Sequence, residues 1–355
     1  MNILDRHLGA VILQYTCVTM LALLALFAFV SLLEQLGDIG RGDYGFLDAL
    51  AYVALIMPRN LYELFPMATL LGAIIGLSLL AGDSELIALR ASGVSILQIA
   101  LAALKTGAVF MLAAVLAGEF LAPAAETRAQ RGRAEALQQH IGGQTNFGLW
   151  LRDSGAYVNI GEVLPDLSLI GVKIFEFDSA NKLRAMIFAA HGRFESGRLA
   201  LNDAAQTRFT EDGGAETAKF GELERGSELT PNILSVFLLQ PDQLSLRQLR
   251  RYIGHLKQNR QQSAPYELAF WGKLMLPLSV AVMVVLAIPF VFANLRSGAL
   301  GRSLFTGIML GLGFHAANKG FGYLALAYEL PPLLGATLPT AAFLLLALVM
   351  MRRIA

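Results

Sequence analysis

The chain has 355 residues, of which 55% are hydrophobic and 15% are charged. Because an ordinary soluble domain has roughly 25% charged residues, this composition indicates an integral membrane protein. The net charge of +1 provides no basic field of the kind that attracts nucleic acid, and the single cysteine, Cys17, excludes an intrachain disulfide and a thiolate metal site.

The first apolar run, residues 8–33, is too long for the hydrophobic region of a cleaved signal peptide, so we expect a membrane-spanning helix there. A helix needs about 20 mainly apolar residues to cross a bilayer. Six segments meet this requirement, at approximately 10–34, 62–81, 98–122, 269–293, 303–325 and 333–351.

The second of these segments follows another apolar stretch that two prolines interrupt, Pro58 and Pro66. Proline removes a helical hydrogen bond and clashes with the preceding turn. The sequence therefore predicts a helix at the membrane interface, followed by a span that begins near Leu64.

Residues 123–268 differ in character, because short β-rich runs alternate there with turn signals. The turn signals are Asp153 to Gly155, Asp178 to Asn181, Glu195 to Gly197 and Asp212 to Gly214. Strands at this spacing predict an antiparallel sandwich or roll. The predicted fold is six membrane helices with an inserted all-β domain at 123–268, between helical parts at 1–122 and 269–355.

The distribution of arginine in the short loops predicts the orientation, because cytoplasmic loops are enriched in Lys and Arg. The short loops on the other side contain only Arg41. The sequence therefore predicts that both termini are cytoplasmic and that the β domain lies outside. The arginines on the predicted cytoplasmic side are Arg6, Arg90, Arg296, Arg302, Arg352 and Arg353.

The turn between the second and third spans, "GDSELIALRASGVS", predicts a short cytoplasmic helix near residues 83–95. Asp83 or Ser84 can cap its start, Glu85 complements the helix dipole, and Gly93 can end it. Its apolar face needs a partner, which is either the membrane interface or another protein. The pattern leaves open a plain interfacial turn.

Three stretches resemble the LptF/LptG permease family, which exports lipopolysaccharide in Gram-negative bacteria: "NILDRHLG", "PMATLLGAIIGLSLLAGDSELIALRASGVS" and "KLMLPLSVAVMVVLAIPFVFANLRSGALGRSL". The resemblance covers essentially the whole chain and is closer to the LptG branch. It implies an inner-membrane transport subunit and not an enzyme, with a periplasmic β-jelly roll. ATP and magnesium would bind to a partner, since the chain lacks the G-x-x-x-x-G-K-[ST] loop.

The resemblance also implies partners and a role for the short helix. The expected partners are a paralogous permease (LptF), a dimeric cytoplasmic ATPase (LptB), a bitopic protein (LptC) and a periplasmic bridge. The short helix would be a coupling helix that docks on the ATPase. Its residues are Asp83, Ser84, Glu85, Leu86, Arg90, Ala91, Ser92 and Gly93.

Arginine suits the phosphates of a lipid A-type substrate, because its planar fork donates two parallel hydrogen bonds. The candidate lipopolysaccharide-binding residues at the outer ends of the spans are Arg133, Arg131, Arg128, Arg41, Arg59 and Glu34. Some relatives have lysines at the outer end of the first span, whereas this chain has Glu34, so Arg133 is the best candidate. Each arginine could equally belong to a solvated surface.

Ionisable residues within spans are costly and are therefore functional candidates. His315 and Lys319 share a helix face with Gly311, and this face could contact a partner or line a cavity. Lys105, Glu119 and Lys273 lie near span ends, where they can reach the interface. No catalytic pattern stands out, and the histidines outside the spans lack ligand spacing: His140, His191 and His255.

The leading interpretation is a permease subunit that extracts lipopolysaccharide from the inner membrane and passes it to a periplasmic bridge. One alternative is an ABC permease that transmits mechanical movement to its outer domain without moving substrate. A second alternative is a membrane-anchored periplasmic receptor or assembly protein without transport.

Overall fold

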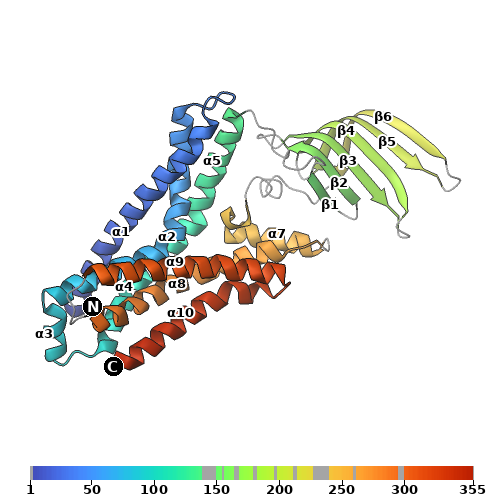
Figure 1. Cartoon of the computed structure of the whole chain (residues 1–355). Coiled ribbons are helices and arrows are strands. Elements are labelled where there is room, and N and C mark those ends of the chain that lie inside the picture. Colours follow the sequence, from blue (N-terminus) through green and yellow to red (C-terminus); the bar gives the residue numbers. More distant parts are fainter. Residues whose placement is uncertain are drawn as a thin grey trace. The chain divides into compact units, whose positions relative to one another are not determined.

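A computed structural model describes residues 3–137, 149–153, 156–163, 168–178, 182–195, 198–210, 214–226, 240–258, 261–294 and 300–354 (Figure 1). The chain forms two compact units. The helical unit comprises residues 1–34, 53–126 and 264–355, and the second unit comprises residues 35–52 and 127–263.

Long helices make up the helical unit, and three of them have residues that belong to the second unit. A π-helical turn, Ala117–Leu121, joins α4 to α5, so that the two form one continuous rod. The helices are α1 (Ile3–Gln35), α2 (Phe46–Gly82), α3 (Glu85–Ala91), α4 (Ile96–Leu116), α5 (Ala122–Ala136), α8 (Ala264–Asn294), α9 (Leu300–Ala327) and α10 (Pro332–Ile354).

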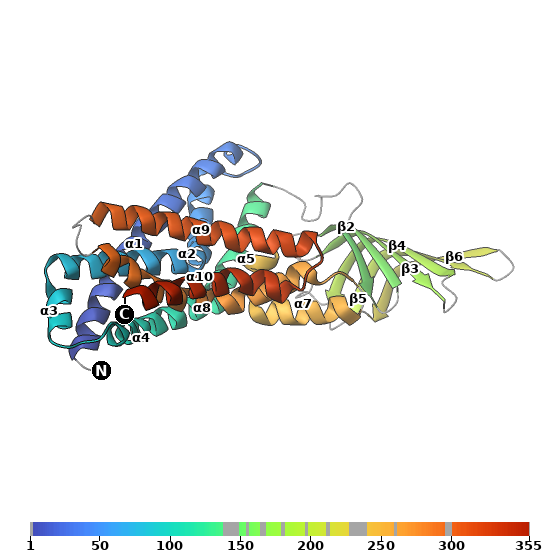
Figure 2. The same ribbon diagram turned by 60° about the horizontal axis from the view of Figure 1, so that its bottom comes forward.

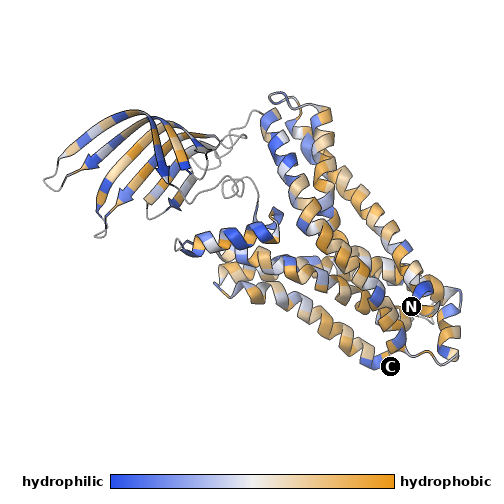
Figure 3. Ribbon diagram, turned by 180° about the vertical axis from the view of Figure 1, so that it is seen from behind, coloured by the Kyte–Doolittle hydropathy of each residue, from blue (hydrophilic) through white to orange (hydrophobic). Residues whose placement is uncertain are grey.

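Five helical stretches of the described residues are long and apolar enough to cross a membrane. They are α1, α2, the α4–α5 rod, α8 and α10, and Figure 3 shows these helices coloured as hydrophobic over most of their length. The helix α9 covers the fifth predicted span but is less apolar than the others. Five of the six segments predicted to span the membrane therefore lie in helices that are long and apolar enough to do so.

The predicted break before the second span is wrong. The helix α2 runs without interruption for 37 residues and contains both Pro58 and Pro66. Each proline removes only one intrahelical donor, and packing against neighbouring helices can hold the rest of the helix together. Near Pro66, the hydroxyl of Thr69 donates to the carbonyl oxygens of Phe65 and Pro66, at 2.8 and 3.0 Å.

A close crossing fixes α1 against α2. A Cβ atom at Gly72 would overlap the backbone of Thr16, and one at Gly76 would lie 3.2 Å from the side chain of Val11. Gly72 and Gly76 form a G-x-x-x-G pattern, which lets two helix backbones approach closely in a membrane. This pattern in "LLGAIIGL" could have been recognised in the sequence.

Six strands of the second unit pair antiparallel in sequence order. Strands end and begin on either side of all four predicted turns, which confirms those boundaries, although most turn residues lie outside the described ones. The strands are β1 (Leu149–Asp153), β2 (Ala156–Val163), β3 (Leu169–Phe177), β4 (Leu183–Glu195), β5 (Arg198–Phe209) and β6 (Ala215–Gly226).

The sheet curls so that its last strand reaches its first. Arg225 on β6 lies 3.5 Å from the buried carboxylate of Asp153 on β1 and 3.2 Å from that of Glu176 on β3. An apolar cluster that includes Val158, Ile174 and Leu201 forms the core of the sheet. A curled antiparallel sheet agrees with the predicted roll, but sequential strand order is that of a meander, so the jelly-roll topology is not confirmed.

Helices adjoin the strands in sequence, within the segment predicted to be all β. The end of α5 precedes β1, and a short helix, α7 (Leu246–Gln258), follows β6. The strands that the structure describes lie between residues 149 and 226, and α5 and α7 occupy parts of the predicted β segment at 123–268.

We expect Gly72→Ala to destabilise the helical unit, because the added methyl group would force α1 and α2 apart at Thr16. Overpacking of this kind costs about 1–3 kcal/mol. Thermal unfolding in detergent measures the effect, with Gly82→Ala as control, because no atom lies within 4 Å of a Cβ there. Equal unfolding midpoints for the two variants would contradict the close crossing.

Candidate functional site

The short helix α3 connects α2 to α4, as predicted (Figure 2). One side chain, Leu86, anchors it: Leu86 is fully buried in the core cluster that also contains Leu8 and Ile12 of α1. Ser84 begins the helix in the left-handed region, with φ of 63°, and its side chain makes no capping hydrogen bond. The predicted cap by Ser84 is therefore wrong.

The end of α3 and the start of α4 follow local rules. Gly93, with φ of +93°, ends α3 as predicted, and the amide nitrogens of Gly93 and Val94 donate to the carbonyl oxygens of Arg90 and Leu89. Ser95 and Gln98 then form a capping box that starts α4. A Ser-x-x-Gln spacing is a sequence signal for this box, so it could have been predicted.

Two polar pairs connect the first turns of α1 to this region. His7 Nε2 lies 2.7 Å from Glu85 Oε2, and both side chains are about half exposed. Lys105 Nζ on α4 donates to Asp5 Oδ2 at 2.6 Å, and Asp5 is 7% exposed. Lys105 thus pairs with a carboxylate on α1, while its own side chain is 55% exposed.

The rest of α3 faces outward. Ile87 is 52% exposed, and Ala88, Arg90, Ala91, Ser92 and Gly93 are exposed as well. An apolar side chain, small residues and one cation thus share a short rigid surface. Small residues allow the close approach of another backbone, so this surface has the chemistry of a docking element.

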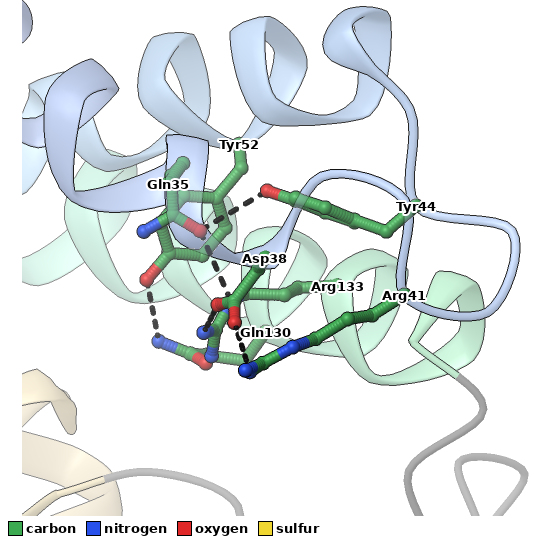
Figure 4. Close-up of polar contacts among 7 residues, drawn as sticks. All are labelled: Gln35, Asp38, Arg41, Tyr44, Tyr52, Gln130 and Arg133. Carbon is green, nitrogen blue, oxygen red and sulfur yellow. Dashed lines mark hydrogen bonds and ion pairs between the residues drawn. The ribbon is translucent and has the colours of Figure 1, made fainter.

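A second polar cluster surrounds Asp38, which follows α1 in the turn Leu36–Asp38 (Figure 4). Arg41 Nη1 donates to Asp38 Oδ1 at 2.8 Å, and Arg133 Nη2 donates to Asp38 Oδ2 at 2.5 Å. Arg41 and Arg133, two of the candidate lipopolysaccharide-binding residues, therefore converge on the carboxylate of Asp38. One anion between two cations leaves a net charge of +1.

Further contacts fix Arg133. Its Nε donates to Gln35 Oε1 at 3.1 Å, and its guanidinium lies 5.6 Å from the ring centre of Tyr52. The buried Tyr44 hydroxyl donates to the same Gln35 oxygen. Burial raises the pKa of Tyr44 above its usual value, so the phenol remains a donor at neutral pH. Arg133 is thus held by three side chains.

The other predicted arginines do not join this cluster in the described contacts. Arg128 and Arg131 lie three residues apart on α5, whereas Arg133 lies about 140° from Arg128 around the helix. Arg59 faces two carboxylates, Glu63 at 2.9 Å and the buried Glu126 at 3.7 Å. Glu34 is exposed.

The two polar residues of α9, His315 and Lys319, are exposed on its surface. Gly311, predicted on their face, is instead buried, and a Cβ there would lie 2.8 Å from Met67 of α2. The small residues therefore pack within the chain, while the polar pair faces away from it.

Lys273 is buried, although the sequence placed it near a span end. Its Nζ donates to the carbonyl oxygen of Gly118 at 3.3 Å and lies 5.4 Å from the ring centre of Tyr62. Gly118 belongs to the π-helical turn, and Tyr62 packs directly against it. The prediction that Lys273 simply reaches the interface is therefore wrong.

The histidines outside the predicted spans are not expected to form a metal site, because they lack the spacing of metal ligands. His191 is exposed on β4 and His255 is buried on α7, while His140 lies outside the described residues. Within the part of the chain that the structure describes, no three His, Cys, Asp or Glu side chains gather as metal ligands.

Comparisons with known proteins identify the same family over nearly the whole length of the chain. The family model described as lipopolysaccharide export system permease LptF/LptG matches residues 6–353. The lipopolysaccharide export system permease protein LptG of Escherichia coli (strain K12) is 36% identical over 357 residues, which cover 99% of this chain and 98% of that protein. LptG of Haemophilus influenzae is 32% identical over 347 residues, or 97% of each chain.

We expect Arg133→Ala to loosen the segment that follows α1 more than Arg41→Ala does. Arg133 is 29% exposed and makes two charge-assisted hydrogen bonds, worth about 1.5–3 kcal/mol each, whereas the pair of the 70% exposed Arg41 contributes about 0.2–1 kcal/mol. Amide hydrogen exchange at residues 40–45 should rise at least about tenfold in Arg133→Ala. A larger increase in Arg41→Ala would contradict the described geometry.

Proposed function

Because the chain belongs to the LptF/LptG family of lipopolysaccharide export permeases, we propose that it is a membrane subunit of the transporter that moves lipopolysaccharide out of the inner membrane. The match to LptG proteins over nearly the full length of both chains carries this proposal. The subunit would pass lipopolysaccharide toward a periplasmic bridge to the outer membrane.

The transmembrane part would comprise six spans, with α9 as the sixth. At 1.5 Å per residue, its 28 residues extend about 42 Å, which exceeds a hydrocarbon core of about 30 Å. His315 and Lys319 would then face the paralogous permease or a shared cavity, because lipid solvates charged groups poorly. Both termini would be cytoplasmic and the sheet periplasmic, as the arginine distribution predicts; of those arginines, Arg296 lies outside the described residues.

The helix α3 would dock on a cytoplasmic ATPase, which would supply the ATP site and its magnesium. Its exposed face, with Ile87, Arg90 and Ala91, supports this role, since a helix held by one buried leucine is free to present its remaining sides. Glu85 would contact the ATPase while it remains paired with His7, so that His7 and the ATPase would share the Glu85 carboxylate. Asp83, Ser84, Leu86, Ser92 and Gly93 would shape the same contact.

The polar pairs of α1 would carry movement from α3 into the spans. His7 contacts Glu85 on α3, and Asp5 contacts Lys105 on α4, so any displacement of α3 pulls on the start of α1. The crossing at Gly72 would act as the fixed point. In the part of α1 that follows this crossing, Leu21 and Phe29 are exposed. Because these side chains do not pack against the chain, this part of α1 would be able to move.

The cluster around Asp38 would bind phosphates of lipopolysaccharide. Its two arginines share one carboxylate, so one positive charge remains for an anion. A phosphate would compete with Asp38 for Arg133 and Arg41, which makes the contact reversible. Arg128, Arg131 and Arg59 are further candidates at the outer ends of the helices, and Glu34 would lie at their edge.

The β domain would be a jelly roll that continues onto similar domains of LptC and the periplasmic bridge. Its edge strands β1 and β6 support this role, because an edge strand offers unpaired backbone groups to another strand. A receptor without transport would not need the docking surface of α3. A purely mechanical transmitter would have no use for the cationic cluster around Asp38.

Thiol accessibility in intact cells should establish the topology. In a Cys17→Ser background, we expect a membrane-impermeant reagent to label Lys219→Cys on β6 directly. Ser92→Cys should react only after the inner membrane is breached, since it would face the cytoplasm. The opposite pattern of labelling would overturn the proposed orientation.

Mass spectrometry of the purified complex tests the function itself. The intact complex should retain an ATPase and lipopolysaccharide. Loss of one partner of an interfacial charge pair costs about 2–5 kcal/mol, so Glu85→Ala and Arg90→Glu should lower ATPase retention at least roughly tenfold. Glu216→Ala, at an exposed glutamate outside the candidate sites, is the control.

Each outcome of that experiment has a distinct meaning. Equal ATPase retention in Glu85→Ala and the unmodified protein would count against docking through α3. A complex with ATPase but without lipopolysaccharide would favour the mechanical transmitter, and a chain with neither would favour the receptor.

A further inference from the structure

The helix α7 concentrates positive charge on one face. Arg247, Arg250 and Arg251 are exposed and lie at the i, i+3 and i+4 spacing that brings side chains to one side of a helix. The 13 residues of α7 contain no aspartate or glutamate, whereas the whole chain has a net charge of only +1. Among the described residues, these three arginines form no ion pair.

The other side of α7 is buried. Leu249, Tyr252 and Leu256 are at most 5% exposed, so the helix is held by its apolar face and directs its arginines outward. A capping box fixes its start: Ser245 Oγ accepts from the Gln248 nitrogen, and Gln248 Oε1 accepts from the Ser245 nitrogen. Figure 3 colours much of α7 as hydrophilic. The basic face is therefore a fixed surface.

The chain itself keeps this surface near the membrane. Gln258 ends α7 and Ala264 begins the apolar helix α8, so the two residues are at most about 21 Å apart. The amide of Gln261 donates to Leu256, which shortens the connection further. The first turns of α8 contain Tyr266 and Trp271, and these residue types gather where a helix enters the headgroup region.

We propose that the basic face of α7 binds the phosphate groups of anionic phospholipids at the membrane surface where α8 enters. Guanidinium groups donate paired hydrogen bonds to phosphate, and basic residues near a bilayer are attracted to anionic headgroups. This inference does not depend on lipopolysaccharide being the transported substrate.

Thermal unfolding of the full-length protein in neutral detergent tests the proposal. Added phosphatidylglycerol should raise the unfolding midpoint, and phosphatidylcholine should not. The triple variant Arg247→Gln, Arg250→Gln, Arg251→Gln should need about a hundredfold more phosphatidylglycerol for half of the shift, at about fivefold per arginine. The matched control is Lys173→Gln, Arg184→Gln, Lys219→Gln, which removes three exposed charges from the sheet and should behave as the unmodified protein.

Three results would overturn the proposal: an unchanged lipid requirement in the triple variant, equal stabilisation by phosphatidylcholine, or stabilisation by lipopolysaccharide alone. The last result would assign the surface to the substrate. If the triple variant does not fold, Arg250→Gln alone should still raise the requirement about fivefold, and its failure to do so would be equally decisive.

Discussion

The apolar surface that the helices leave uncovered is the constraint on which the rest of the structure depends. Leu21 on α1 and Leu345 on α10 are 69% and 65% exposed, and similar side chains occur along every long helix. Apolar surface in water costs roughly 25 cal/mol per Å², so only hydrocarbon or other apolar chains can cover this much. The long helices therefore need a bilayer or a partner of similar polarity, and the two polar clusters around Glu85 and Asp38 lie at the ends of these helices.

The proposed function rests on two groups of polar side chains at the ends of the long helices. His7 pairs with Glu85 of α3 and Asp5 pairs with Lys105 of α4, so the start of α1 contacts two helices that are distant from it in sequence. The cluster around Asp38 holds two arginines on one carboxylate, which leaves them ready for a competing anion. A short helix with an exposed face and two arginines on one carboxylate are the parts that the proposed lipid exporter would use.

The sequence predicted those features that depend on neighbouring residues. Apolar runs identified the long helices, and turn signals identified the strand boundaries, because both follow from local composition. The break predicted from Pro58 and Pro66 is absent, since a local rule cannot include the packing that keeps α2 intact. The partners of Glu85 and Arg133 could not be predicted: His7 lies 78 residues from Glu85, and Asp38 lies 95 residues from Arg133.

The most direct test is the ATP-driven transfer of lipopolysaccharide from proteoliposomes that contain all subunits to a water-soluble acceptor. The comparison is between the intact chain and one in which a glycine–serine segment of equal length replaces Glu85–Ala91. We expect transfer to require ATP with the intact chain and to fall to the ATP-independent level with the replaced segment. Transfer at an undiminished, ATP-dependent rate with the replaced segment would contradict the account.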